Sequence, residues 1–283
     1  MRNLFMFLCM STAITFPIQA GTGIVYGSNP KAGHHVHVNG IELYYEVYGK
    51  GHPLLLMHGN GGSIHSMRYQ IPAFAKHFEV IAVDSRAQGR STDSNAPLTF
   101  TLMASDMAGL LDSLNIDSAY VVGWSDGAII GLKLALDYPQ KVAKLVADGA
   151  NFVADSTALP ESMLREMATT PFSKLSPATQ REIVKHSFFP KQAGIIFDKL
   201  NELDLKHPNF TLDQLHSIGA PTLVMAGDHD LIKLGHTVRL FQNLPHAELC
   251  IVPGAHHNLL QTKSALANRI IIDFLEKPFV DMK

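Results

Sequence analysis

The fold is decided by Val121-Val122-Gly123-Trp124-Ser125-Asp126-Gly127. The apolar run 119–122 predicts a buried strand, and the apolar spacing over 128–138 predicts a helix directly after it. Gly-x-Ser-x-Gly between a strand and a helix is the pattern of a nucleophile elbow, a sharp turn that exposes a serine Oγ at the end of a sheet. Glycine occupies the positions two residues before and after the serine because larger side chains would collide there.

Short apolar runs alternate with helical patterns along most of the chain. An Asn39-Gly40 turn predicts an antiparallel hairpin near the start, formed by 34–38 and 41–48. We expect further strands over 53–57, 79–83, 142–147, 221–227 and 248–252, and helices over 66–77, 100–114, 234–244 and 263–275. This alternation predicts an α/β fold with a mostly parallel central sheet flanked by helices.

The pattern changes between residues 152 and 214. This segment has helix-like pieces interrupted by prolines and no convincing strand, which predicts a small helical cap inserted over the site. The expected organisation is a signal peptide over 1–20, a loose arm over 21–33, an α/β core over 34–151 and 215–283, and the cap over 152–214.

The first 20 residues have the features of an export signal. Arg2 supplies a positive start, 4–16 is apolar but too short to span a bilayer, and Ala20 offers a small residue before a cleavage site. We therefore expect the chain to be exported, periplasmic or secreted, with no stable membrane insertion of the mature part. An uncleaved anchor and a buried N-terminal helix are the alternatives.

Composition excludes several classes of protein. A chain of 283 residues that is 46% hydrophobic can build one sizeable α/β domain, and its net charge of −2 gives no indication of a nucleic-acid partner. Cys9 and Cys250 cannot form a cysteine metal site or a disulfide framework. The 15 histidines show no metal-protease spacing, and His34-His35-Val36-His37 is interpreted as a solvated edge strand. We expect no metal and no cofactor.

A serine nucleophile needs a histidine base that is held by an acid. In the elbow architecture the chain order is serine, acid, histidine, each following a strand. The residues alone leave two acids, Asp228 and Asp230, and two histidines, His256 and His257.

The chain resembles the α/β-hydrolases over nearly all of its mature length, and in particular the valacyclovir hydrolase (biphenyl hydrolase-like) subgroup. The residues that carry the resemblance are Gly123-Trp124-Ser125-Asp126-Gly127, Tyr138-Pro139, Gly149-Ala150-Asn151 and His257-Asn258-Leu259. The family's acid ends a Gly-x-x-Asp turn, which implies Asp230 over Asp228. Its histidine precedes Asn-Leu, which implies His257 over His256.

The resemblance also implies an oxyanion hole. Its backbone donors would be Asp126, which follows the nucleophile, and Asn60, in a glycine-rich loop where Gly59 lets the backbone approach a substrate. The Asp126 side chain has two readings: a partner for a cationic substrate, as in the named subgroup, or an acid that interacts with the helix dipole. One departure is Arg86-Ala87-Gln88-Gly89, where the family usually has Arg-Gly-x-Gly.

The expected function is hydrolysis of carboxylic esters of small or medium acyl substrates through an acyl-enzyme formed on Ser125. The partner is a small-molecule ester, and the sequence makes no prediction of oligomeric state. The same triad also serves C–C bond hydrolysis, lactone hydrolysis and cofactor-free peroxidation. A triad-bearing binding protein with little turnover is a further alternative from another class.

Overall fold

The central sheet has eight strands. The computed structural model describes residues 24–281, in which the strand order is β1-β2-β4-β3-β5-β6-β7-β8. β1–β2 and β2–β4 are antiparallel, and every pair from β4 to β8 is parallel, which confirms the predicted α/β fold. The strands are β1 (Gly33–Val38), β2 (Ile41–Tyr48), β3 (His52–Met57), β4 (Phe78–Val83), β5 (Ala119–Trp124), β6 (Val142–Asp148), β7 (Thr222–Gly227) and β8 (Ala247–Val252).

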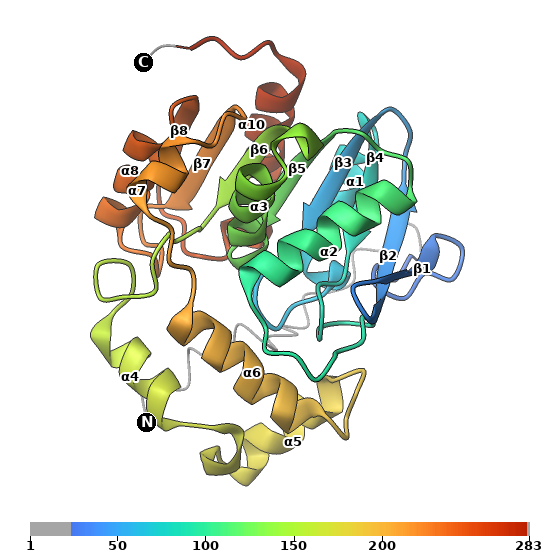
Figure 1. Cartoon of the computed structure of the whole chain (residues 1–283), viewed down its shortest axis with the longest axis vertical. Helices are drawn as coiled ribbons and strands as arrows, with labels where there is room; N and C mark the ends of the chain where they lie inside the picture. The colour runs from blue at the N-terminus through green and yellow to red at the C-terminus, as the bar shows by residue number, and fades with distance from the viewer. Residues whose placement is uncertain (1–23, 282–283) are drawn as a thin grey trace.

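Helices cover both faces of the sheet (Figure 1). α2, α3, α7 and α8 contribute to the core on one face, whereas α1, α9 and α10 contribute to the core on the other. The bounds are α1 (Ile71–Phe74), α2 (Phe100–Ser113), α3 (Asp126–Asp137), α7 (Leu212–His216), α8 (Leu234–Asn243), α9 (Leu259–Thr262) and α10 (Ser264–Glu276). Apolar residues on both sides of each central strand explain why those strands are continuous apolar runs.

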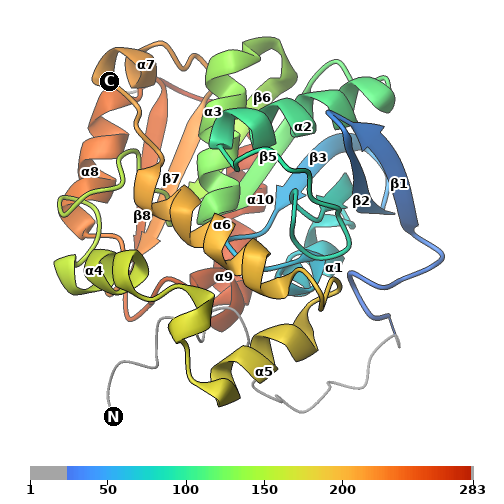
Figure 2. The same ribbon diagram turned by 60° about the horizontal axis from the view of Figure 1, so that its bottom comes forward.

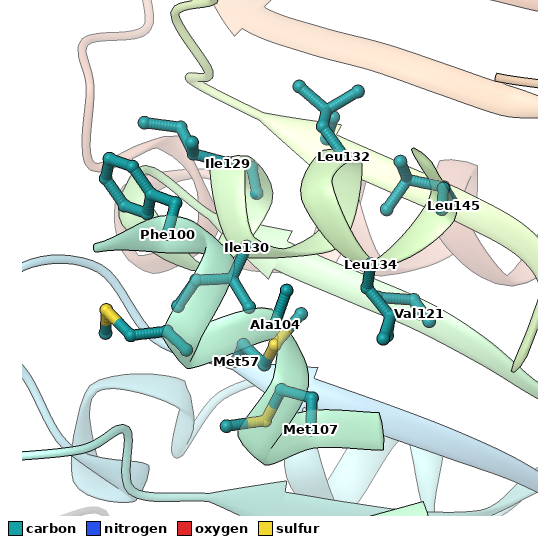
Figure 3. Close-up of a cluster of buried hydrophobic side chains, with 14 of the residues drawn as sticks. Met57, Phe100, Ala104, Met107, Val121, Ile129, Ile130, Leu132, Leu134 and Leu145 are labelled. Carbon is teal, nitrogen blue, oxygen red and sulfur yellow. The ribbon is translucent and has the colours of Figure 1, made fainter. Parts of the chain in front are cut away.

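Helix α3, which directly follows Ser125, packs against the sheet through a dense apolar cluster (Figure 3). Ile130 and Leu134 of α3 lie between Met107 of α2 and the sheet residues Val121 and Leu145, and all five side chains are buried. Complete burial of such a side chain contributes about 2 kcal/mol. The turn between β5 and α3 therefore has rigid packing on both sides.

One predicted helix, over 66–77, is wrong in its extent. The chain forms a 3₁₀ turn, Ile64–Met67, and then the short α1, Ile71–Phe74. Pro72 lies in the first turn of α1. Because proline has no backbone N–H to bond to the carbonyl four residues earlier, a continuous helix through this position is disfavoured.

The segment before β1 is held against the sheet. Glu46 is completely buried, and its carboxylate accepts hydrogen bonds from the N–H groups of Gly27 and Asn29, each at 2.8 Å. The hydroxyls of Tyr44 and Tyr48 donate to the same carboxylate, also at 2.8 Å. A side chain of β2 therefore satisfies part of the backbone of residues 27–29, and the loose arm over 21–33 stays a prediction.

We expect Glu46→Ala to lower the free energy of unfolding by about 3 kcal/mol, because four buried or partly buried donors lose their acceptor. Urea denaturation of the purified protein measures this change. Glu42→Ala is the matched control on the same strand, since Glu42 is 42% exposed and pairs only with His35 among the ion pairs of the described chain. A loss no larger for Glu46→Ala than for Glu42→Ala would contradict the anchoring role.

Residues 149–221, between β6 and β7, are called here the β6–β7 insertion. They contain α4 (Glu161–Thr169), α5 (Pro177–His186), α6 (Ala193–Lys206) and α7. Figure 1 shows α4, α5 and α6 gathered at the lower end of the molecule, which is turned toward the viewer in Figure 2, and α6 packs against both others. Val153 and Asn209 form an antiparallel bridge near the two ends of the insertion. Its status as a separate cap over 152–214 stays a prediction.

The predicted signal peptide, 1–20, lies outside the described residues. Among residues 24–281, none of the helices combines the length and the apolar character that a membrane span requires.

Candidate active site

Ser125 stands on a strained turn between β5 and α3. Its φ is 56° and its ψ −122°, a conformation that side-chain-bearing residues rarely adopt and that costs about 1–3 kcal/mol. A Cβ at Gly123 would lie 2.2 Å from the carbonyl oxygen of Gly127, and one at Gly127 would lie 2.5 Å from that of Met57. The two glycines are therefore required by close backbone approach, as the elbow pattern predicts.

Three sequence-predicted residues form one hydrogen-bonded chain. Ser125 Oγ lies 2.9 Å from His257 Nε2, and His257 Nδ1 lies 2.7 Å from Asp230 Oδ1. With the proton on Nδ1, the imidazole donates to Asp230 and leaves Nε2 free to accept the Ser125 hydroxyl proton. This arrangement can convert a serine hydroxyl into a nucleophile.

Asp230 is suited to hold a positive imidazolium. Its side chain is 2% exposed, and burial raises the pKa of the carboxyl. The hydrogen bond from His257 and the charge of that ring outweigh burial, so the pKa ends below its ordinary value. The N–H of Ile232 also donates to Asp230 Oδ1 at 2.9 Å. Asp230 is thus an ionised, oriented acceptor.

The two alternative candidates lie elsewhere. Asp228 is 36% exposed and accepts a hydrogen bond from the N–H of Ala255. His256 is exposed, and its Nδ1 lies 3.1 Å from the carbonyl oxygen of His229. Neither is part of the hydrogen-bonded chain through Ser125, although each is within two residues of a member of it.

Two residues that sequence reasoning missed support His257. Trp124 donates its indole N–H to the His257 carbonyl at 2.7 Å, and the two rings are 5.7 Å apart. Gly149, with φ 65°, leaves space for the imidazole, since a Cβ there would lie 2.8 Å from His257 Cε1. Both residues were visible in the quoted motifs, but their contacts with His257 depend on the tertiary fold.

The loop after β3 lies against Ser125. A Cβ at Gly59 would be 2.9 Å from Ser125 Cβ, so only backbone fits there. His58 comes directly before Gly59. Its Nε2 accepts a hydrogen bond from the N–H of Ser85 at 3.0 Å, and its Nδ1 lies 2.7 Å from the carbonyl oxygen of Gly59. Complete burial lowers the pKa of His58 to about 4, so a neutral imidazole fixes the start of this loop.

The far side of the same loop is held by the turn 86–89, which is the turn that departs from the family pattern. Gln88 Oε1 accepts the N–H of Gly61 at 2.6 Å, and Gln88 itself is 4% exposed. Ala87 beside it has φ 65°, the left-handed region in which the family's usual glycine is favoured. The altered turn is therefore accommodated at Ala87 and leaves the Ser125–His257–Asp230 chain intact.

Asp126, the first residue of α3, is 4% exposed and meets a second carboxyl from the β6–β7 insertion. Burial raises the pKa of Asp126 to about 7, and Asn60 and Asp204 are its side-chain hydrogen-bonding neighbours. Asn60 Nδ2 also donates to Asp204 Oδ2 at 2.9 Å. Sequence reasoning did not single out Asp204, which lies in a helix without a motif.

No group of three or more histidine, cysteine or acidic side chains within 24–281 is arranged to hold a metal ion.

Residues 52–201, more than half of the chain, match the family model described as alpha/beta hydrolase fold. The chain belongs to the α/β-hydrolase family. It is 28% identical over 270 residues to "Serine hydrolase BPHL" of Homo sapiens, with 91% of each chain covered. It is 31% identical over 265 residues to "Putative carbamate hydrolase RutD" of Variovorax paradoxus (strain S110), covering 84% of this chain and 97% of the relative.

Among solved structures, the α/β-hydrolase chain is similar to "Est816 as an N-Acyl homoserine lactone degrading enzyme". The identity is 26% and the TM-score 0.70, with 85% of this chain and 100% of the other covered. Both sequence relatives are thus named as hydrolases, one of them as a putative carbamate hydrolase, whereas the solved structure is named as a lactone-degrading enzyme.

Proposed function

We propose that Ser125, His257 and Asp230 are a catalytic triad that hydrolyses carboxylic esters of small or medium acyl groups. The observation that carries this proposal is the hydrogen-bonded chain of the three side chains, with 2.9 Å between Ser125 Oγ and His257 Nε2 and 2.7 Å between His257 Nδ1 and Asp230 Oδ1. The serine in this chain lies on a strained turn between two glycines. The strained backbone points to a functional turn, because structural turns of this kind normally use glycine at the positive φ.

The reaction has two steps. His257 Nε2 takes the Ser125 proton as Oγ attacks the ester carbonyl, and the protonated ring then gives that proton to the departing alcohol. Water attacks the acyl-enzyme with His257 again as the base, and the acid leaves as Ser125 regains its proton. Asp230 stabilises the imidazolium in both steps.

We assign the oxyanion hole to the backbone N–H groups of Asn60 and Asp126. The close approach of Gly59 to Ser125 and the place of Asp126 at the first turn of α3 support this assignment. Each donor is worth about 3 kcal/mol in the transition state. The helix N-terminus adds a favourable field for the developing negative charge.

A lactone is the second candidate substrate, favoured by the likeness to the N-acyl homoserine lactone degrading enzyme. A lactone is a cyclic ester, so the same steps open it. Amino-acid esters are a further candidate substrate class, because Asp126 and Asp204 place two carboxyl groups beside the site.

Fluorophosphonate labelling combined with turnover of p-nitrophenyl butyrate tests the proposal. We expect covalent labelling at Ser125 and steady release of p-nitrophenol that survives EDTA. Labelling without steady release would favour a triad-bearing binding protein, and loss of release with EDTA would favour a metal-dependent hydrolase.

We also propose that the chain is exported after cleavage near Ala20. N-terminal sequencing of the mature protein from the producing cells tests this, and a mature chain starting at Met1 would overturn it.

A further inference from the structure

The two residues assigned to the oxyanion hole have side chains that meet a common partner. Asn60 lies in the loop after β3, and its Nδ2 donates to Asp204 Oδ2 at 2.9 Å. Asp126 lies at the start of α3, and its carboxyl is a hydrogen-bonding neighbour of Asp204 as well. Asp204 belongs to α6 of the β6–β7 insertion. One carboxyl of the insertion thus touches both residues that would present the oxyanion amides.

We propose that Asp204 is a positioning residue that aligns the Asn60 and Asp126 amides when α6 is packed over the site. The proposal rests on the ester-hydrolase function proposed above. Asp204 touches neither Ser125 nor a reacting atom in this proposal. It acts by holding the side chains of Asn60 and Asp126, the two residues whose own backbone N–H groups are the proposed oxyanion donors.

The contact between the two carboxyls requires a proton. Asp126 Oδ2 is buried without a hydrogen-bond partner unless Asp204 supplies one. Burial, and then the charge of Asp126, raise the pKa of Asp204 well above its ordinary value. A protonated Asp204 donates to Asp126 and accepts from Asn60, which satisfies all three side chains.

The charged surroundings of this pair are limited. His257 faces Asp126 from the loop after β8 and favours its ionised form, whereas the facing side chain from the loop after β3 is the neutral Asn60. On α6 itself, Glu202 pairs with Lys206 and Lys199 pairs with Asp93. Loss of the shared proton would therefore leave two buried carboxylates in contact, which repel each other.

A second attachment keeps α6 in place without Asp204. Lys199 Nζ lies 2.6 Å from Asp93 Oδ2 and donates to the carbonyl of Ser94 at 2.8 Å. Buried apolar residues of the same helix, among them Phe197 and Leu200, add packing. We therefore expect substitution of Asp204 to disturb the oxyanion amides more than the fold.

The test compares Asp204→Leu with Asp204→Asn in the full chain. Asparagine can still accept from Asn60 and donate to Asp126, whereas leucine can do neither. We expect Asp204→Leu to lower kcat for p-nitrophenyl butyrate about 100-fold, with a smaller change in KM, because misplaced amides cost transition-state stabilisation. Asp204→Asn should keep kcat within about threefold of the wild type, since both hydrogen bonds are retained.

The pH profile separates positioning from a general structural role. Wild-type kcat should fall on the alkaline side as the carboxyl pair loses its shared proton. Asp204→Asn should lack that fall, because an amide does not ionise. Glu202→Gln, two residues away on α6 and paired with Lys206 at the surface, is the matched control and should keep the wild-type profile.

Two results would overturn the role of Asp204: wild-type kcat in Asp204→Leu, or equal losses in the leucine and asparagine variants. If Asp204→Leu does not fold, Asn60→Ala replaces it, since this variant keeps its backbone N–H and loses only the side-chain link. Asn60→Ala should then lower kcat, and an unchanged kcat would overturn the proposal. A wild type with no labelling and no turnover would overturn the ester-hydrolase function as well, which distinguishes the two failures.

Discussion

Ser125→Ala is expected to lower kcat for p-nitrophenyl butyrate by about 10⁴- to 10⁶-fold, the loss seen when a triad nucleophile is removed. The variant keeps the oxyanion amides and His257, but water must then attack the bound ester directly. Residual turnover above the uncatalysed rate should remain, since binding and the oxyanion hole contribute independently of the nucleophile. Steady-state rates, normalised by active-site titration of the wild type, measure the loss of kcat and the residual turnover of the variant.

The Ser125→Ala variant should fold normally. The elbow has a positive φ at residue 125, and alanine carries the same Cβ as serine, so the substitution adds no new steric strain to this backbone. Ser217→Ala, an exposed serine remote in sequence from the relay, is the matched control and should leave kcat unchanged. Activity of Ser125→Ala within tenfold of the wild type would contradict the assignment, and so would labelling of the variant.

The sheet could be predicted from sequence because its strands carry their own signal. β3 and β7 are fully apolar at their centres, which is the pattern of strands buried on both faces. The hairpin between β1 and β2 was also correctly predicted, since Asn39 and Gly40 have the positive φ values that its tight turn requires. In both cases the feature that determines the structure, an apolar strand centre or a turn with positive φ values, lies within a few consecutive residues.

The contacts that arise from packing could not be predicted in this way. Asp204 occupies an ordinary position in α6, and its contact with Asn60 spans 144 residues of chain. Likewise, Glu46 accepts a hydrogen bond from the N–H of Gly27 across 19 residues, although Gly27 itself lies in a segment with the composition of a loose arm. A local pattern contains no information about which distant donor will meet a buried carboxylate.

The candidate site contains both kinds of feature, those with a local sequence signal and those that depend on tertiary packing. Motifs singled out Ser125 and restricted the candidate acid and the candidate histidine to two positions each, because each candidate follows a strand at one edge of the sheet. The choice of Asp230 and His257 came from family resemblance and stays a prediction; the structure brings these two side chains into one hydrogen-bonded chain with Ser125. The supporting contacts of Trp124 and Gly149 became visible only with the imidazole in place.

The second large effect is expected for Asp230→Ala, which should lower kcat about 10⁴-fold, the size of loss measured when a triad aspartate is removed. Without Asp230 the His257 ring loses its Nδ1 acceptor at 2.7 Å, so its tautomer and orientation are no longer fixed. The imidazolium formed in each step also loses its counter-charge. Steady-state rates with p-nitrophenyl butyrate measure the loss, and thermal unfolding checks that the variant is folded.

Asp228→Ala provides the matched control, because both acids lie in the same turn after β7 and differ by two positions. Asp228 is 36% exposed and holds only the edge of the histidine loop through the N–H of Ala255, whereas Asp230 is 2% exposed and bonded to the ring itself. Its substitution should leave kcat near the wild-type value. Equal losses in the two variants would mean that the turn as a whole, and not the carboxylate on His257, supports the reaction.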